Sequence, residues 1–179
     1  MDERILTAAF AIMSESGFRG LRADGLAARA DVPKSTIYRR WPSLADLAVN
    51  AVDARLGPRA PVPTDDPLAD MASILVAVHT ILSQPGLART LPQLALELTE
   101  RPEAAAAYRA RVIAPLRDGA LAAVERAVTA GLWEGPDAAA SVDAMIGALL
   151  YRVTYLGLAP SREECFDLAE AIARRPLPR

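Results

Sequence analysis

Apolar residues recur at helical spacing through almost the whole chain, and this pattern predicts an all-α fold. Near the N-terminus, Ile5, Ala9 and Met13 lie four residues apart on one face of a helix expected over residues 3–16. Later segments with the same spacing bring the expected total to about nine helices. Two short helices are expected within 22–41, and the others cover 43–56, 68–83, 87–100, 103–131, 136–157 and a last segment that begins at 161.

Prolines divide this helical pattern into two parts. Residues 57–67 contain four prolines and the acidic pair Asp65-Asp66, a composition typical of a stiff, exposed connector. The expected organisation is therefore a head over residues 1–50 and a larger helical domain over 51–179, with the fourth helix shared between them. Pro115 predicts a kink or a restart inside the long helix over 103–131.

The second of the two short helices carries the candidate chemistry of the head. Ile37 and Trp41 are four residues apart and can pack inward together. The opposite, outward side then carries cations, a hydroxyl and a phenol, with Arg40 beside them: Lys34, Ser35, Tyr38 and Arg39. Such groups can bind phosphates and base edges.

The charge of this segment differs in sign from that of the chain. Residues 22–40 hold five cations and two anions, whereas the whole chain has a net charge of −2. A basic island on an acidic protein favours a directed DNA-binding face, and the pattern fits a helix-turn-helix. A helical hairpin with a solvated charged face fits the same spacing and charge, so the residues alone leave both interpretations open.

Residues 5–52 resemble the DNA-binding head of the TetR (tetracycline-repressor) family of bacterial transcription regulators. The matching residues are Ile5-Leu6-x-x-Ala9-Phe10, Gly17-Phe18, Leu26-Ala27-x-x-Ala30-x-Val32 and Thr36-Ile37-Tyr38-x-x-Trp41-x-Ser43, followed by Leu47. The resemblance implies a three-helix head and a C-terminal helical domain for ligand sensing and dimerisation. It also implies that DNA is contacted by Arg22, Ala23, Lys34, Ser35, Thr36, Tyr38, Arg39 and Arg40.

Three positions depart from the pattern of the family. Asp31 stands where the turn usually has glycine, and Leu44 stands where a lysine commonly starts the fourth helix. Asp24 stands where a polar or basic residue is frequent. Asp tolerates the left-handed conformation better than most residues, so the turn is expected to survive. Fewer cations should weaken the electrostatic part of DNA binding.

The C-terminal part matches no motif residue by residue. In the TetR family such domains hold a small-molecule effector among their middle helices. Polar or aromatic residues among apolar helices are the candidates for that pocket here, namely His79, Gln93, Glu97, Tyr108, Trp133 and Tyr151. The helix over 136–157 is apolar on nearly all sides and needs burial on more than one. A helix central in its own monomer fits the same pattern, so the residues alone leave that alternative open. The favoured expectation, which the family also implies, is a homodimer formed through residues 136–175.

Other classes of protein have less support. The sequence has no glycine-rich phosphate loop and no nucleophile paired with a base, so an all-α enzyme is disfavoured and no catalytic residue is proposed. One cysteine and one histidine cannot supply a usual metal site, and no cofactor is expected. No apolar run is long enough for a membrane span, and the lone Cys165 fits the bacterial cytoplasm.

The sequence therefore favours a dimeric, ligand-responsive DNA-binding regulator, most simply a repressor that a small molecule releases from a palindromic operator. The alternative is a helical binding or scaffold protein with a degenerate helix-turn-helix, for which Asp24 and Leu44 are the only support.

Overall fold

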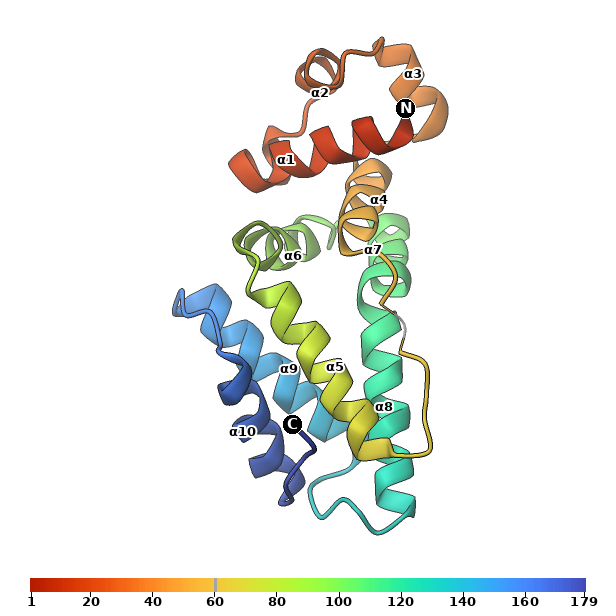
Figure 1. Cartoon of the computed structure of the whole chain (residues 1–179). Coiled ribbons are helices and arrows are strands. Elements are labelled where there is room, and N and C mark those ends of the chain that lie inside the picture. Colours follow the sequence, from red (N-terminus) through yellow and green to blue (C-terminus); the bar gives the residue numbers. More distant parts are fainter. Residues whose placement is uncertain (60) are drawn as a thin grey trace. The chain divides into compact units, whose positions relative to one another are not determined.

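The computed structural model describes residues 1–59 and 61–179, and all the regular structure in them is helical (Figure 1). The helices are α1 (Asp2–Gly20), α2 (Ala23–Ala30), α3 (Lys34–Arg40), α4 (Leu44–Leu56), α5 (Pro67–Leu82), α6 (Pro85–Glu97), α7 (Pro102–Tyr108), the π-helical η1 (Arg109–Ile113), α8 (Ala114–Thr129), α9 (Ala138–Tyr155) and α10 (Arg162–Ala173). Because α7, η1 and α8 follow one another without a break, the described residues hold nine helical runs. The all-α prediction and the expected count are confirmed.

The chain folds into two compact units. Unit 1 consists of Met1–Pro58 and Gly86–Ile113, and unit 2 consists of Arg59–Pro85 and Ala114–Arg179. In unit 1, α1 packs against α4, and α2 leads into α3 (Figure 1). The largest fully buried side chains of its main core come from both segments of the unit: Ile5, Met13, Leu26, Ile37, Leu47, Leu94 and Leu98.

These units differ from the predicted domains 1–50 and 51–179. The difference arises because α4 packs against α7 and η1, and because Leu94, Tyr108 and Val112 are buried in the same core as the head. The functional division into a DNA-binding domain over 1–50 and a helical domain over 51–179 stays a prediction.

Several helices begin or end at capping residues, close to the helix boundaries that the sequence predicted. Gly17 adopts a φ of 71° and interrupts α1, as expected for a helix ending near residue 16. The Ser43 side chain accepts a hydrogen bond of 3.1 Å from the backbone N–H of Asp46 and caps α4. Ser161 and Glu164 form a capping box at the start of α10, where the last helix was expected to begin.

The π-helical segment η1 lies just before Pro115. Proline has no backbone N–H, and its ring clashes with the carbonyl four residues earlier, here that of Arg111. The wider π turn over Arg109–Ile113 accommodates this clash without ending the helix. The predicted irregularity at Pro115 is therefore present as a π segment.

Unit 2 is built from α5, α8, α9 and α10, which pack on one another (Figure 1). Phe166 is the largest fully buried side chain of its core and is 1% exposed. The guanidinium groups of Arg162 and Arg179 lie 5.6 and 5.2 Å from the centre of its ring. The residues after α10 thereby pack back onto that helix, and Leu177 is buried with it.

Taken singly, none of the helices in the described ranges has both the length and the apolar character that a membrane crossing requires. Within the described residues, one bent pair, α5 with α6, meets the two criteria when its helices are taken together.

A buried carboxylate ties the connector of unit 2 to two helices. Asp70 of α5 is 5% exposed, accepts hydrogen bonds from the backbone N–H and the hydroxyl of Thr64, and pairs with Arg126 of α8. Arg126 also donates a hydrogen bond of 2.6 Å to the carbonyl oxygen of Thr64. Burial disfavours the charged carboxylate, but the hydrogen bonds from Thr64 and Arg126 outweigh it and lower the pKa of Asp70.

Replacing this carboxylate should destabilise the fold. We expect Asp70→Asn to lower the free energy of unfolding by about 1–3 kcal/mol, because it leaves buried donors with poorer partners. Urea unfolding at neutral pH measures the change. The matched control is Asp143→Asn, which removes an exposed carboxylate paired with Arg117 at 3.0 Å and should cost about 0.5 kcal/mol or less. Equal losses in the two variants would contradict this account.

The same carboxylate should make stability depend on pH. Because the pKa of Asp70 is lower in the folded state, its contribution is fully present above the unfolded pKa of about 3.9. It is lost as the pH falls below that value and through the folded pKa. The stability difference between the protein and Asp70→Asn should therefore be constant near neutral pH and shrink below about pH 4. A difference that grows on acidification would contradict the assigned direction.

Candidate nucleic-acid interface

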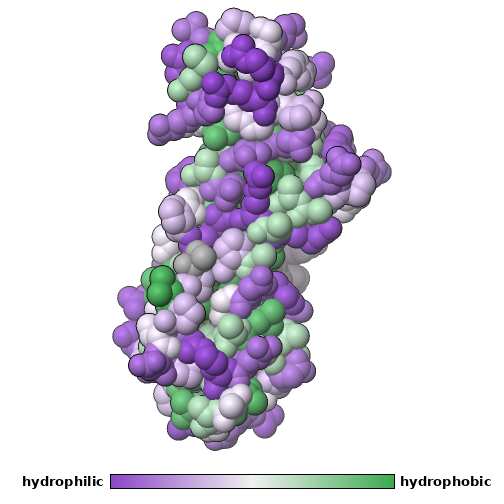
Figure 2. All heavy atoms as spheres, turned by 90° about the vertical axis from the view of Figure 1, so that its right-hand side faces the viewer, coloured by the Kyte–Doolittle hydropathy of each residue, from purple (hydrophilic) through white to green (hydrophobic). Residues whose placement is uncertain are grey.

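Helix α3 presents one face to the core of unit 1 and the other to solvent. Ile37 is 1% exposed and Trp41, the residue that ends the helix, is 8% exposed. The opposite side of the helix is exposed, with Lys34, Ser35, Tyr38, Arg39 and Arg40. The structure therefore has the inward and outward sides that the spacing predicted. Hydrophilic residues cover much of the head in Figure 2, which views the side where α3 lies in Figure 1.

The turn between α2 and α3 sets the direction of that exposed face. Asp31 adopts the left-handed conformation, with φ 50° and ψ 56°, and ends α2. Its carbonyl oxygen accepts a hydrogen bond of 2.8 Å from Arg4 of α1. The departure from glycine at this position thus leaves the turn intact, as the tolerance of Asp for this conformation predicted.

The remaining residues of the predicted DNA face lie at helix starts. Arg22 is the exposed N-cap residue of α2, and Ala23 is the first residue of that helix. Thr36 is half-buried in α3, and its backbone N–H donates to the carbonyl of Pro33 at 3.0 Å. The free N–H groups at helix starts attract anions such as phosphates. Of the eight predicted residues, Arg22 caps α2, Ala23 begins it, and the other six belong to α3. Their contacts with DNA stay a prediction.

Acidic residues pair with two cations of this face. Nζ of Lys34 lies 2.7 Å from Oδ1 of Asp24, and Arg40 pairs with Asp2. The hydrogen bond between Lys34 and Asp24, strengthened by the attraction of their charges, raises the pKa of the lysine and lowers that of the carboxyl. Within the described ranges, Arg22 and Arg39 form no salt bridge. Sequence reasoning identified the cations but missed both acidic partners.

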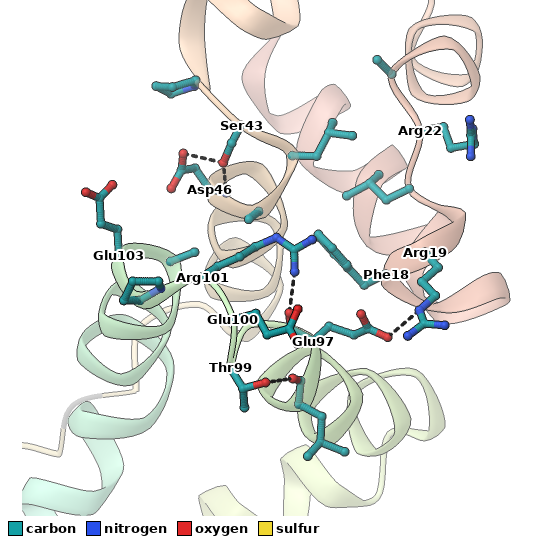
Figure 3. A pocket seen from close by; sticks show the side chains of 18 of the residues that line it. Phe18, Arg19, Arg22, Ser43, Asp46, Glu97, Thr99, Glu100, Arg101 and Glu103 are labelled. Carbon is teal, nitrogen blue, oxygen red and sulfur yellow. Dashed lines mark hydrogen bonds and ion pairs between the residues drawn. The ribbon is translucent and has the colours of Figure 1, made fainter.

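A groove of about 1460 Å³ lies beside the start of α2, wholly within unit 1 (Figure 3). One side is formed by the end of α1 and the starts of α2 and α4, and the other by Leu96–Ala104. Figure 3 shows the ion pair between Arg19 and Glu97, 2.9 Å apart, and the guanidinium of Arg101 over the ring of Phe18. Both acidic and basic side chains therefore line the groove.

Three of the predicted effector-binding residues lie in unit 1. Gln93 is exposed on α6, and Glu97 is paired with Arg19. Tyr108 is buried, donates a hydrogen bond of 2.9 Å to the carbonyl of Leu91, and has its pKa raised by burial. Of these three, only Glu97 lines the groove.

The other three, His79, Trp133 and Tyr151, lie in unit 2. Nε2 of His79 lies 3.1 Å from the hydroxyl of Ser83, one turn along the same helical segment. Trp133 is buried and donates from its indole N–H to the carbonyl of Pro136, whereas Tyr151 is exposed and stacks on Tyr155. The role of all six residues in effector binding stays a prediction.

In the part of the chain that the structure describes, no group of three or more His, Cys, Asp or Glu residues is arranged to hold a metal ion. Cys165 is buried, and burial raises the pKa of its thiol.

Two family matches cover almost the whole chain. Residues 5–51 match the family described as "Bacterial regulatory proteins, tetR family", and residues 61–172 match the "Tetracyclin repressor-like, C-terminal domain". The uncharacterized HTH-type transcriptional regulator YdeS of Bacillus subtilis is 31% identical over 156 residues, which span 86% of this chain and 78% of the relative.

Solved structures show the same fold. The TetR family transcription regulator SCO0332 is 26% identical, with a TM-score of 0.64, and the match covers 98% of this chain and 97% of that chain. The regulator FadR from Bacillus subtilis, in complex with stearoyl-CoA, has a TM-score of 0.73 at 14% identity, with 95% and 96% covered. The head geometry, the family matches and the relatives agree, and the chain belongs to the TetR family of DNA-binding transcription regulators, which are not enzymes.

Proposed function

We propose that this regulator is a cytoplasmic homodimeric repressor that binds a near-palindromic operator and is released from it by a small molecule. The observation that supports the proposal most strongly is the two-sided α3. Its apolar side is held in the core while its polar side is open to solvent. A short helix fixed in this way can enter a DNA major groove without rearrangement of the head.

The exposed side of α3 offers chemistry suited to reading DNA. Arg39 forms no salt bridge within the described ranges, and a guanidinium can bind O6 and N7 of a guanine with two hydrogen bonds. Tyr38 is 49% exposed, and its hydroxyl can reach a phosphate or a base edge. Arg22 and the start of α2 are suited to the flanking phosphates.

An uncovered face of α9 supports the homodimer. Ala140, Ala144, Gly147, Tyr151 and Tyr155 are exposed and follow one another at intervals of three or four residues, so they lie on one side of the helix. Small residues allow a second helix to approach closely, and the two stacked tyrosines add apolar area. A second copy of the same face would cover this surface in a twofold-symmetric interface.

Two copies would then present two α3 helices to one operator. In helix-turn-helix dimers the half-sites lie about 34–36 Å apart, one turn of DNA. A small molecule that favours a different spacing of the heads lowers operator affinity through a coupling of about 1–3 kcal/mol. FadR, which has the same fold, was solved with stearoyl-CoA. We therefore propose an effector site among the helices of the C-terminal part.

Removing the guanidinium of Arg39 should reduce the preference for the selected sequence. We expect Arg39→Ala to weaken binding to a duplex selected by the protein by about 1–3 kcal/mol while affecting an unrelated duplex less, because a base contact is lost. Fluorescence anisotropy with both duplexes measures this. The control is Arg89→Ala, which removes an exposed arginine of α6 with the same change in charge. An equal loss for both duplexes would show that Arg39 contacts only phosphates.

A charge placed on the α9 face should separate the dimer. A Cβ added at Gly147 would meet open space in the protomer, so Gly147→Arg should leave the protomer folded. Two buried arginines would then face each other across the interface and disfavour association. Analytical ultracentrifugation should show a dimer for the protein and a monomer for Gly147→Arg. Val128→Arg, at an exposed position of α8, is the control and should remain dimeric. A Gly147→Arg protein that remains dimeric would exclude this face as the interface.

A further inference from the structure

The two ends of α3 carry cations that are already paired with carboxylates. Lys34 is the first residue of the helix and pairs with Asp24 of α2, and Arg40 is its last residue and pairs with Asp2 of α1. Both carboxylates therefore come from other helices of the head. Lys34 and Arg40 are also among the residues that our proposed function places against DNA.

These pairs are exposed and can be exchanged. The side chains of Lys34 and Asp24 are 55% and 84% exposed, and those of Arg40 and Asp2 are 36% and 51% exposed. Exposed pairs of this kind contribute little to folding, since water competes for both charges. Nothing in their burial prevents another anion from replacing the carboxylate.

We propose that Asp24 and Asp2 act as intramolecular stand-ins for DNA phosphates, which must displace them from Lys34 and Arg40 when the head binds DNA. The inference rests on the proposed DNA-binding function and adds a control of affinity to it. A carboxylate and a phosphate are both anions that accept charge-assisted hydrogen bonds from the same cation. Each new contact with DNA at these two positions is therefore offset by the loss of an existing pair.

The exchange has a second consequence, because a displaced carboxylate remains close to its cation and to the incoming phosphate. Like charges repel, so Asp24 and Asp2 also disfavour the DNA complex after they have been displaced. The acidic residues therefore act on every duplex, whatever its sequence. They should keep the affinity of the head for DNA moderate, while the base contacts of Tyr38 and Arg39 determine which sequence is preferred.

The test compares the DNA affinity of Asp24→Asn with that of the unaltered protein. Two duplexes are used, one selected from a random pool and one with the same bases in scrambled order. We expect Asp24→Asn to bind both duplexes about 1.5- to 5-fold more tightly, the range that an exposed ion pair provides. The slope of log affinity against log salt should become steeper, by at most about 0.9, the value of one phosphate contact.

Glu15→Gln is the matched control. It removes one negative charge from the same head and thereby breaks the 2.6 Å pair of Glu15 with Arg29, a residue outside α3. Its effect measures the general influence of net charge, and it should be smaller than that of Asp24→Asn. In a Lys34→Ala background, the gain from Asp24→Asn should fall to the level of the control, because the cation that it releases is absent. Asp2→Asn, near the N-terminus, repeats the test at Arg40.

Several results would overturn the inference: weaker binding by Asp24→Asn, a gain no larger than that of Glu15→Gln, or a gain that persists without Lys34. Weaker binding would show that Asp24 positions Lys34 for its contact. Failure of the proposed function is a separate result, since it would show as equal affinity of the unaltered protein for the selected and scrambled duplexes. The scrambled duplex alone still tests the exchange in that case, and a protein with no affinity for DNA would overturn both.

Discussion

The packing of Ile37 and Trp41 into the core of unit 1 is the constraint on which the account depends. A helix of seven residues is too short to be stable alone, so α3 exists because its apolar side is buried. Burial also fixes the rotation of the helix about its axis. The exposed side must then carry Tyr38 and Arg39, and the left-handed Asp31 ends α2 before α3 begins. Local chemistry and core packing together orient the residues proposed to contact DNA.

Features that depend on local chemistry could be predicted from the sequence. The helical fold, the interruption of the first helix at Gly17, the turn at Asp31 and the start of a helix at residue 43 each follow from a few neighbouring residues, and the structure confirms them. The exposed face of α3 followed in the same way from the spacing of Ile37 and Trp41. Periodicity shows which side of a helix is apolar, and for α3 that information was sufficient to predict which side is exposed.

Features that join distant segments could not be predicted from the same signals. Periodicity does not say which helix covers which, so the packing of α7 and η1 against α4 was missed. It also does not pair charges across helices, as between Asp24 and Lys34 or Asp70 and Arg126. The six effector candidates were predicted only because they are polar or aromatic residues among apolar helices. The structure distributes them over both units, where Tyr108 and Trp133 already satisfy their polar groups within the protein.

The central claim is that the exposed face of α3 reads a DNA sequence as part of a twofold-symmetric dimer. Selection of binding sites from a random duplex pool by the full-length protein tests it most directly. The account predicts an enriched motif with two inverted half-sites whose centres are about one helical turn apart. Recovery of no common motif, with the same weak affinity for all duplexes, would contradict it.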